Sequence, residues 1–489
     1  AFPATRWQKL LDAGFEDTGV IVAEGFDYEI LDLAFKPHDN LSVTVTLKAS
    51  GEIEKTLVAS IAEALKADPG LPDFTRLKEI FRAPSLKMVS FTITEKGYSL
   101  EQGGQLSPPV ADDFARGPAA PASYIGKVAA LLYERFLAGR LPLAMVSMDN
   151  CSHNGDILFA SMRTFAREWA KAGLVEAGFS EYVENPQAVS FPWTMIDKIT
   201  PRPDEDVKKM LVNAGLEGAD PRTTARFTYV APFVNAEETE YLIVEDLFPN
   251  GRPAFDKAGV IFTDRTTVDK VEKMKVCTCL NPLHLCLAMF GCLFGIRKIS
   301  ETMRDPDLKR LVEIVGYDEG LPVVIDPGII RPRDFLDAVL QIRFPNPFMP
   351  DTPQRIACDL SQKMGIRFGE TIKAYLVRKD LDVRSLTLIP LSIAAWFRYL
   401  LGIDDDGNPF EVSPDPRRNE VEERLKGVKL GDAGPFHDRL QPILSDASLF
   451  HVDLCQAGLG ERIEGYFAEL VAGKGAVRRT LHKYVSARG

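Results

Sequence analysis

A short polar stretch stands directly before the most apolar segment of the chain. It contains Lys275, Asn281 and His284, and the apolar run 285–296 follows without a break. Asn281 and His284 are three residues apart, which places them on one face if a helix begins here, with Asn281 as its N-cap and Pro282 in its first turn. An apolar environment disfavours a charged amine, so we expect a lowered pKa for Lys275 and a base near neutral pH. Taken locally, the same residues also fit an ordinary buried helix start with a core histidine.

Composition narrows the class of protein. The 489 residues exceed what one hydrophobic core usually supports, so two or three domains are expected, and 45% hydrophobic with 26% charged residues is a globular composition. The net charge of −11, without a basic stripe, argues against nucleic acid as a partner. No apolar run reaches the ~18 residues of a membrane span. The seven cysteines lack zinc-site spacing and no signal peptide opens the sequence as given, so we expect no metal and a cytoplasmic protein.

The first half of the chain predicts an α/β, Rossmann-like domain with a mixed sheet. A helix over 4–13 precedes a buried strand over 18–24, and Glu24 stands where a dinucleotide-binding unit places the acid that holds the ribose hydroxyls. Such a carboxylate repels a 2′-phosphate and therefore favours NAD over NADP. The strand and glycine-rich turn that should precede that helix are absent from this sequence. Further elements are expected as strands over 41–47, 87–98, 143–148, 226–230 and 240–245 and helices over 54–67, 74–81, 124–138 and 157–173, with a loop over 103–122.

Polar residues follow two of these strands. Thr94 and Glu95 end the strand over 87–98, and Asn150 follows the strand over 143–148. Ligands bind at the carboxyl ends of such strands, so Thr94 and Glu95 are candidates for the cofactor side and Asn150 for a substrate oxygen. Plain strand ends and turn-shaping asparagines would look the same. Asp197 is a lone carboxylate in an apolar context.

The second half predicts a mostly α-helical domain. The pattern changes near residue 269, which gives a Rossmann-like dinucleotide-binding domain over 1–268 and a helical substrate and catalytic domain over 269–489. Arg355 and Lys363 are eight residues apart, close to two helical turns, so both can face one site. Helices are expected over 285–296, 306–315, 332–343, 354–363, 366–379, 386–401, 420–426 and 460–472.

Several motifs, taken in order, resemble the polyol-specific long-chain dehydrogenases, the mannitol dehydrogenase family. They cover nearly the whole chain and are Thr92–Tyr98, Asp149-Asn150 with Asn154-Gly155, Val189–Pro201, and Lys275 with Asn281 and His284. Residues 278–284 and 350–356 look most like the D-mannonate oxidoreductase (fructuronate reductase) branch. The resemblance implies an NAD-dependent, metal-independent enzyme that interconverts D-mannonate and D-fructuronate.

The resemblance also implies residue roles. Lys275 would be the general base, and Asn150 and Asn281 would donate to the developing alkoxide. His284, Asp197, Arg355 and Lys363 would hold the rest of the sugar, with a guanidinium available for a carboxylate. A monomer or small homo-oligomer with a sugar acid or polyol as substrate is expected.

Two departures from the family pattern keep alternatives open. Pro282 and Leu283 replace a glycine and a serine, and Lys275 precedes Asn281 by one residue more than in mannitol dehydrogenases, so Lys273 is an alternative base. Tyr375 and Lys379 match a Tyr-x-x-x-Lys pair by chance, because they lie in the helical half. A mannitol 2-dehydrogenase or related polyol dehydrogenase is the second hypothesis. A catalytically silent sugar-binding or regulatory protein is the third.

Overall fold

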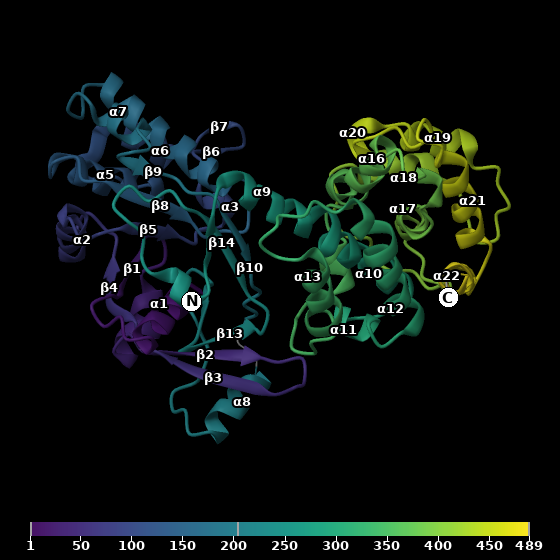
Figure 1. The fold of residues 1–489 in the computed structure, drawn as a ribbon, viewed down its shortest axis with the longest axis horizontal. Helices are drawn as coiled ribbons and strands as arrows, with labels where there is room; N and C mark the ends of the chain where they lie inside the picture. Colours follow the sequence, from purple (N-terminus) through teal and green to yellow (C-terminus); the bar gives the residue numbers. More distant parts are fainter. Residues whose placement is uncertain (1, 203–204, 488–489) are drawn as a thin grey trace. The chain divides into compact units, whose positions relative to one another are not determined.

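The computed structural model describes residues 2–202 and 205–487, which form two compact units. The first, the α/β unit, comprises the described residues up to Leu47 together with Ile53–Asp269. The second, the helical unit, comprises Lys48–Glu52 and the described residues from Lys270 onward. Figure 1 shows strands gathered in the purple to teal part of the chain and helices in the green to yellow part. The expected fold class, a Rossmann-type domain with mixed sheets and a helical C-terminal region, is confirmed.

Parallel strand pairs form the part of the α/β unit that carries strand-end polar residues. β8 (Leu143–Ser147) lies between β5 (Met88–Phe91) and β9 (Val189–Ser190), all parallel, and β1 (Val20–Glu24) pairs in parallel with β4 (Ile61–Lys66). Every residue of β8 is buried, as expected for a strand covered on both faces.

Two further three-stranded sheets are mixed. β14 (Tyr241–Glu245) pairs antiparallel with β10 (Thr194–Asp197) and parallel with β15 (Ile261–Thr263). β2 (Ser42–Leu47) pairs parallel with β13 (Phe233–Glu237) and antiparallel with β3 (Ile53–Val58). Two small hairpins complete the strands, namely β6 (Glu101–Gln102) with β7 (Gln105–Leu106) and β11 (Arg222–Thr223) with β12 (Tyr229–Val230).

Helices supply most of the apolar core of the α/β unit. α5 (Tyr124–Leu137) and α6 (Asn154–Lys171) contribute Leu132, Phe165 and Trp169, all fully buried in one cluster with residues of β8. The other helices here are α1 (Phe2–Asp12), α2 (Pro72–Arg82), α3 (Thr94–Gly97), α4 (Pro108–Arg116), α7 (Phe179–Glu184), α8 (Glu205–Asn213) and the start of α9 (Arg265–Lys273).

The helical unit is built around two apolar helices. Nearly every residue of α10 (Asn281–Leu293) and α17 (Leu388–Leu400) is buried, and a helix that is apolar all round belongs in a core. The remaining helices are α11 (Ile299–Thr302), α12 (Pro306–Glu313), α13 (Pro332–Ala338), α14 (Pro353–Ile356), α15 (Leu360–Met364), α16 (Glu370–Val377), α18 (Arg418–Leu425), α19 (His437–Leu444), α20 (Ala447–Phe450), α21 (Gly460–Val471) and α22 (Ala476–Ser486).

Four π-helical turns interrupt the helices of this unit. They are η5 (Met274–Cys279), η6 (Ile314–Gly320), η8 (Val339–Arg343) and η9 (Gly365–Gly369). Such turns are rare and occur often at functional sites. Together with η5, residues 265–293 form a helical stretch that is long and apolar enough to cross a membrane, so the length expected from the run 285–296 alone was too short. Most of its apolar part is buried inside the protein, as in a core helix.

Some expected elements were wrong. Residues 54–67 are not a helix but β3 and β4, because pairing with β2 and β1 outweighs the helix propensity of their Glu, Ala, Leu and Lys residues. The predicted loop over 103–122 contains α4, and the strand expected over 226–230 is reduced to the hairpin strand β12 while β13 was missed. The single helix expected over 354–363 is broken into α14 and α15, with Asp359 in a left-handed conformation between them.

Candidate active site

Lys275 lies on η5 in the helical unit. Its side chain is only 5% exposed, whereas Lys273, two residues earlier, is exposed. A π-helical turn holds more residues than an α-helical turn, so η5 can absorb the extra residue between Lys275 and Asn281. Thr371 Oγ1 donates to the carbonyl of Cys277 at 3.3 Å, which fastens the turn to α16. Burial therefore distinguishes Lys275 from its alternative as the candidate base.

Asn281 and His284 occupy the first turn of α10. Leu280, not Asn281, precedes the helix as its N-cap, so the expected capping role is wrong; Pro282 does lie in the first turn. Asn281 Oδ1 and His284 Nε2 are buried and have no hydrogen-bond partner among residues 2–202 and 205–487. Unsatisfied buried polar atoms are costly and rare in folded proteins. These two atoms are therefore available to the hydroxyl groups of a ligand.

Four cations surround His284, and we call Arg343, Arg355, Lys363 and Arg367 the cationic cluster. Burial first, and then the positive charges of the cluster, lower the pKa of His284 to about 3. The imidazole is therefore neutral at neutral pH. Its Nε2 lies 3.6 Å from Asp351 Oδ2, but this contact is an ion pair only if the histidine is protonated, which the low pKa excludes.

Two members of the cluster were expected from the sequence, and both have partners within the unit. Arg355 forms an ion pair with Asp351, and Lys363 Nζ donates to the carbonyls of Ile356 (3.1 Å) and Cys358. The two cations do not lie two turns apart on one helix, as their spacing predicted, because Arg355 lies on α14 and Lys363 on α15. The break still leaves both cations near His284.

Arg343 and Arg367 were missed. They lie at the end of η8 and in the middle of η9, respectively. The four-residue spacing of Lys363 and Arg367 is a helical signal that could have found the latter.

In the α/β unit, Glu24 is the last residue of β1. Its Oε1 accepts the backbone N–H groups of Phe26 (2.7 Å) and Asp27 (3.0 Å), which fixes the carboxylate at the strand end. Tyr124, at the start of α5, lies near both Glu24 and Asp149: its pKa is raised by burial first and then by these two carboxylates. The ends of β1 and β8 thus meet around one tyrosine, which was not among the residues predicted from the sequence.

Asp149 joins the ends of β5 and β8. It accepts the N–H groups of Ile93 (2.9 Å) and Thr94 (3.0 Å) and the hydroxyl of Tyr98 (2.6 Å). Thr94 has a left-handed backbone, with φ at 61°, and the side chains of Thr94, Glu95 and Asn150 are exposed. The carboxyl-end edge of these parallel strands therefore presents polar side chains, as a dinucleotide site requires.

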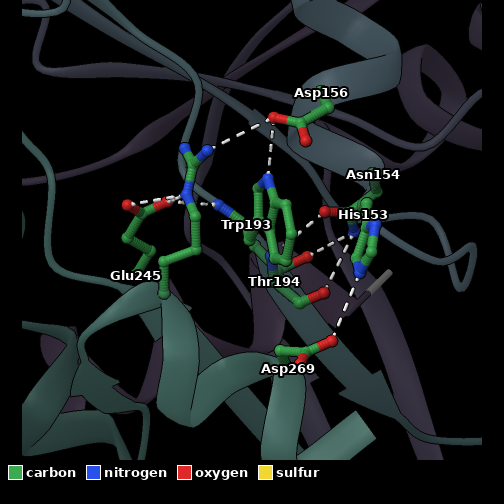
Figure 2. Close-up of polar contacts among 8 residues, drawn as sticks. His153, Asn154, Asp156, Trp193, Thr194, Glu245 and Asp269 are labelled. Carbon is green, nitrogen blue, oxygen red and sulfur yellow. Dashed lines mark hydrogen bonds and ion pairs between the residues drawn. The ribbon is translucent and has the colours of Figure 1, made fainter.

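Asn154 and the residues near it form a saturated network (Figure 2). Asn154 is fully buried; its amide donates to Asp149 O (3.0 Å) and Thr194 Oγ1 (2.7 Å), and its Oδ1 accepts Thr194 N (3.0 Å). His153 stacks on Trp193 with ring centroids 4.0 Å apart and contacts Asp269 at 3.2 Å. Asn154 thus fastens α6 to β10.

Asp197 ends β10 and is 2% exposed. Lys198, which follows it, forms an ion pair with Glu240 at 2.7 Å. The α/β unit therefore carries Glu24, Thr94, Glu95, Asn150 and Asp197, and the helical unit carries Lys275, Asn281, His284, Arg355 and Lys363.

Comparison with known proteins covers both units. Residues 8–257 match the mannitol dehydrogenase Rossmann domain and residues 267–470 the mannitol dehydrogenase C-terminal domain. A D-mannonate oxidoreductase of Thermotoga maritima is 55% identical over 99% of this chain and 90% of that relative. A mannitol 2-dehydrogenase of Pyrenophora tritici-repentis is 33% identical over 80% of this chain and 64% of its own length.

A solved structure has the same overall fold. It is the Pseudomonas fluorescens mannitol 2-dehydrogenase in ternary complex with NAD and D-mannitol, 26% identical, with a TM-score of 0.63 over 94% of this chain and 85% of that one. The relatives are named dehydrogenases and oxidoreductases, so this chain is an oxidoreductase. It belongs to the mannitol dehydrogenase family.

Proposed function

We propose that this protein is an NAD-dependent oxidoreductase that interconverts D-mannonate and D-fructuronate without a metal, with Lys275 as general base. The observation that supports a sugar acid as the substrate is the cationic cluster around His284. The four cations outnumber the carboxylates of Asp351, which pairs with Arg355, and Asp359, which acts on Lys363, so a positive surplus remains beside a neutral histidine. A sugar acid supplies the missing negative charge, whereas an alditol does not. The name of the 55% identical relative agrees with this choice.

The residues at the strand ends of the α/β unit fit the cofactor. Glu24 Oε1 is held by two backbone amides, which leaves Oε2 for ribose hydroxyls, and the carboxylate opposes a 2′-phosphate. Thr94 and Glu95 begin α3, next to the end of β8, and we assign them to the cofactor side as well. NAD, when bound, supplies the acceptor for the hydride that leaves the substrate carbon.

In the oxidation, the Lys275 amine takes the proton of the substrate hydroxyl while the C–O bond becomes a carbonyl. The amide groups of Asn150 and Asn281 donate to the oxygen as its negative charge grows, which lowers the energy of the transition state. Asn281 Oδ1 and His284 Nε2 accept hydroxyl groups of the sugar, and Asp197 holds a further hydroxyl. In the reduction, the Lys275 ammonium returns the proton.

The test is NADH formation by full-length enzyme with D-mannonate and with D-mannitol at equal concentrations. Faster oxidation of D-mannonate supports the proposal, and NADP should replace NAD poorly. Faster oxidation of D-mannitol would instead identify a polyol dehydrogenase. No turnover of either would contradict the proposed activity and favour a silent sugar-binding protein. We further propose that the enzyme acts in the cytoplasm as a monomer or small homo-oligomer.

A further inference from the structure

The members of the cationic cluster differ in what they already bind. Arg355 is paired with Asp351, and Lys363 donates to two backbone carbonyls. Arg343 is 6% exposed and also has a partner. Within the described ranges 2–202 and 205–487, Arg367 makes neither a hydrogen bond nor an ion pair. Desolvation alone lowers its pKa to about 10, so the guanidinium is still charged at neutral pH.

The backbone holds Arg367 beside the other candidate residues. It is the middle residue of η9, and η9 packs against η5, which carries Lys275, and against α10, which carries Asn281 and His284. Among the four cations, Arg367 has the largest effect on His284.

Two glycines make this placement possible. A Cβ atom at Gly365 would collide with the His451 ring, and one at Gly369 would collide with the carbonyl of Phe450. The turn therefore lies directly on the residues at the end of α20, and its position is fixed by close packing on both sides of Arg367.

We propose that Arg367 binds the carboxylate of the substrate and selects a sugar acid over an uncharged alditol. This inference rests on the proposed function and adds the residue that sets its specificity. A partly desolvated cation without a partner is unfavourable until an anion arrives, and a guanidinium can bind a carboxylate through two parallel hydrogen bonds. An alditol in the same position would leave the guanidinium unpaired, and a site built for a polar group rejects the analogue that lacks it.

The experiment compares wild-type, Arg367→Gln, Arg367→Lys and a control, Arg331→Gln, in the full-length enzyme with NAD. Arg331 is 83% exposed and paired with Asp334, so its loss should change neither substrate. We expect Arg367→Gln to lower kcat/KM for D-mannonate by at least ~100-fold and to change kcat/KM for D-mannitol by less than ~3-fold. Arg367→Lys keeps the charge but loses the planar fork, so its loss should be intermediate. Equal losses on both substrates would overturn the inference.

The stability of Arg367→Gln shows whether Arg367 acts in substrate specificity or only supports the fold. The midpoint of urea unfolding of Arg367→Gln should equal or exceed that of the wild-type, because an unpaired cation is removed from a desolvated place. A lower midpoint together with parallel losses on both substrates would show that Arg367 merely supports the fold.

The wild-type result decides the proposed function separately. If wild-type enzyme oxidises D-mannonate and Arg367→Gln does so equally well, the inference fails and the proposed function stands. If the wild-type does not oxidise D-mannonate, the proposed function fails. The inference is then decided by whether D-gluconate raises the unfolding midpoint of the wild-type but not of Arg367→Gln; equal shifts overturn it.

Discussion

The polar groups around Asn154 and those around His284 are both buried, yet they differ in how fully they are satisfied. Asn154 uses its amide nitrogen and its Oδ1 on backbone and side-chain partners in β8, β10 and the turn between β8 and α6. Asn281 Oδ1 and His284 Nε2 lack a partner in the part of the chain that the structure describes. A saturated network stabilises a fold, whereas an unsaturated one stands ready for a ligand. Position in a family motif does not separate Asn154 from Asn281, whereas their hydrogen bonds do.

Replacing Lys275 should have the largest effect. Lys275→Ala removes the proposed base, and we expect kcat to fall by at least ~100-fold while NADH binding, followed by its fluorescence, is retained. The control is Lys273→Ala, because Lys273 is exposed and near in sequence. If Lys275→Ala keeps full activity, Lys275 is not the base. If Lys273→Ala alone loses activity, the base is Lys273.

A pair of asparagine variants tests the comparison directly. Asn154→Ala should lower the free energy of unfolding by about 2–3 kcal/mol, because it leaves the buried backbone N–H of Thr194 without its acceptor and removes the amide that donates to Thr194 Oγ1. Asn281→Ala should change that free energy by less than about 0.5 kcal/mol and instead lower kcat/KM. Urea unfolding and steady-state kinetics of both variants measure this contrast. The reverse pattern would contradict the assignment of scaffold and site.

The protonation of His284 should have a smaller effect, a pH dependence of the free energy of unfolding. Its folded pKa of about 3 lies below the ordinary value of 6.5, so the unfolded chain binds the proton more readily. The stability associated with a neutral His284 is thus fully present above about pH 6.5 and is lost as the pH falls toward 3. His284→Gln should therefore lose less stability than the wild-type between pH 7 and pH 4.5, measured by urea midpoints. An equal loss in both proteins would show that His284 does not carry this dependence.

Much of the fold followed from hydrophobic patterning. The apolar runs over 143–148 and 285–296 became β8 and α10, because a short apolar run suits a buried strand and a longer one suits a buried helix. The prediction of a helix over 54–67 was wrong for a different reason. These residues are good helix formers, and only pairing with β2 and β1 makes them β3 and β4.

The sequence motifs predicted which residues are candidates for the site, but not the structure around them. The motifs identified Lys275, Asn281 and His284, whereas the π-helical turns and the roles of Arg343 and Arg367 depend on tertiary packing. The sequence also does not show why glycines stand at 365 and 369, since the reason for both is close packing against the chain at 450–451. Sequence periodicity also could not show that Arg355 and Lys363 already have partners.

The close packing of η9 has a consequence for how substrate range can diverge between relatives. Positions 365 and 369 have no room for a side chain, so substitutions of either glycine should disturb the turn that carries position 367. Position 367 itself is not constrained by a partner within the described chain. A single codon change there can exchange a cation for a neutral side chain while the backbone keeps its path. The preference of the enzyme for charged or uncharged substrates can thus change in evolution without a change in the backbone of η9.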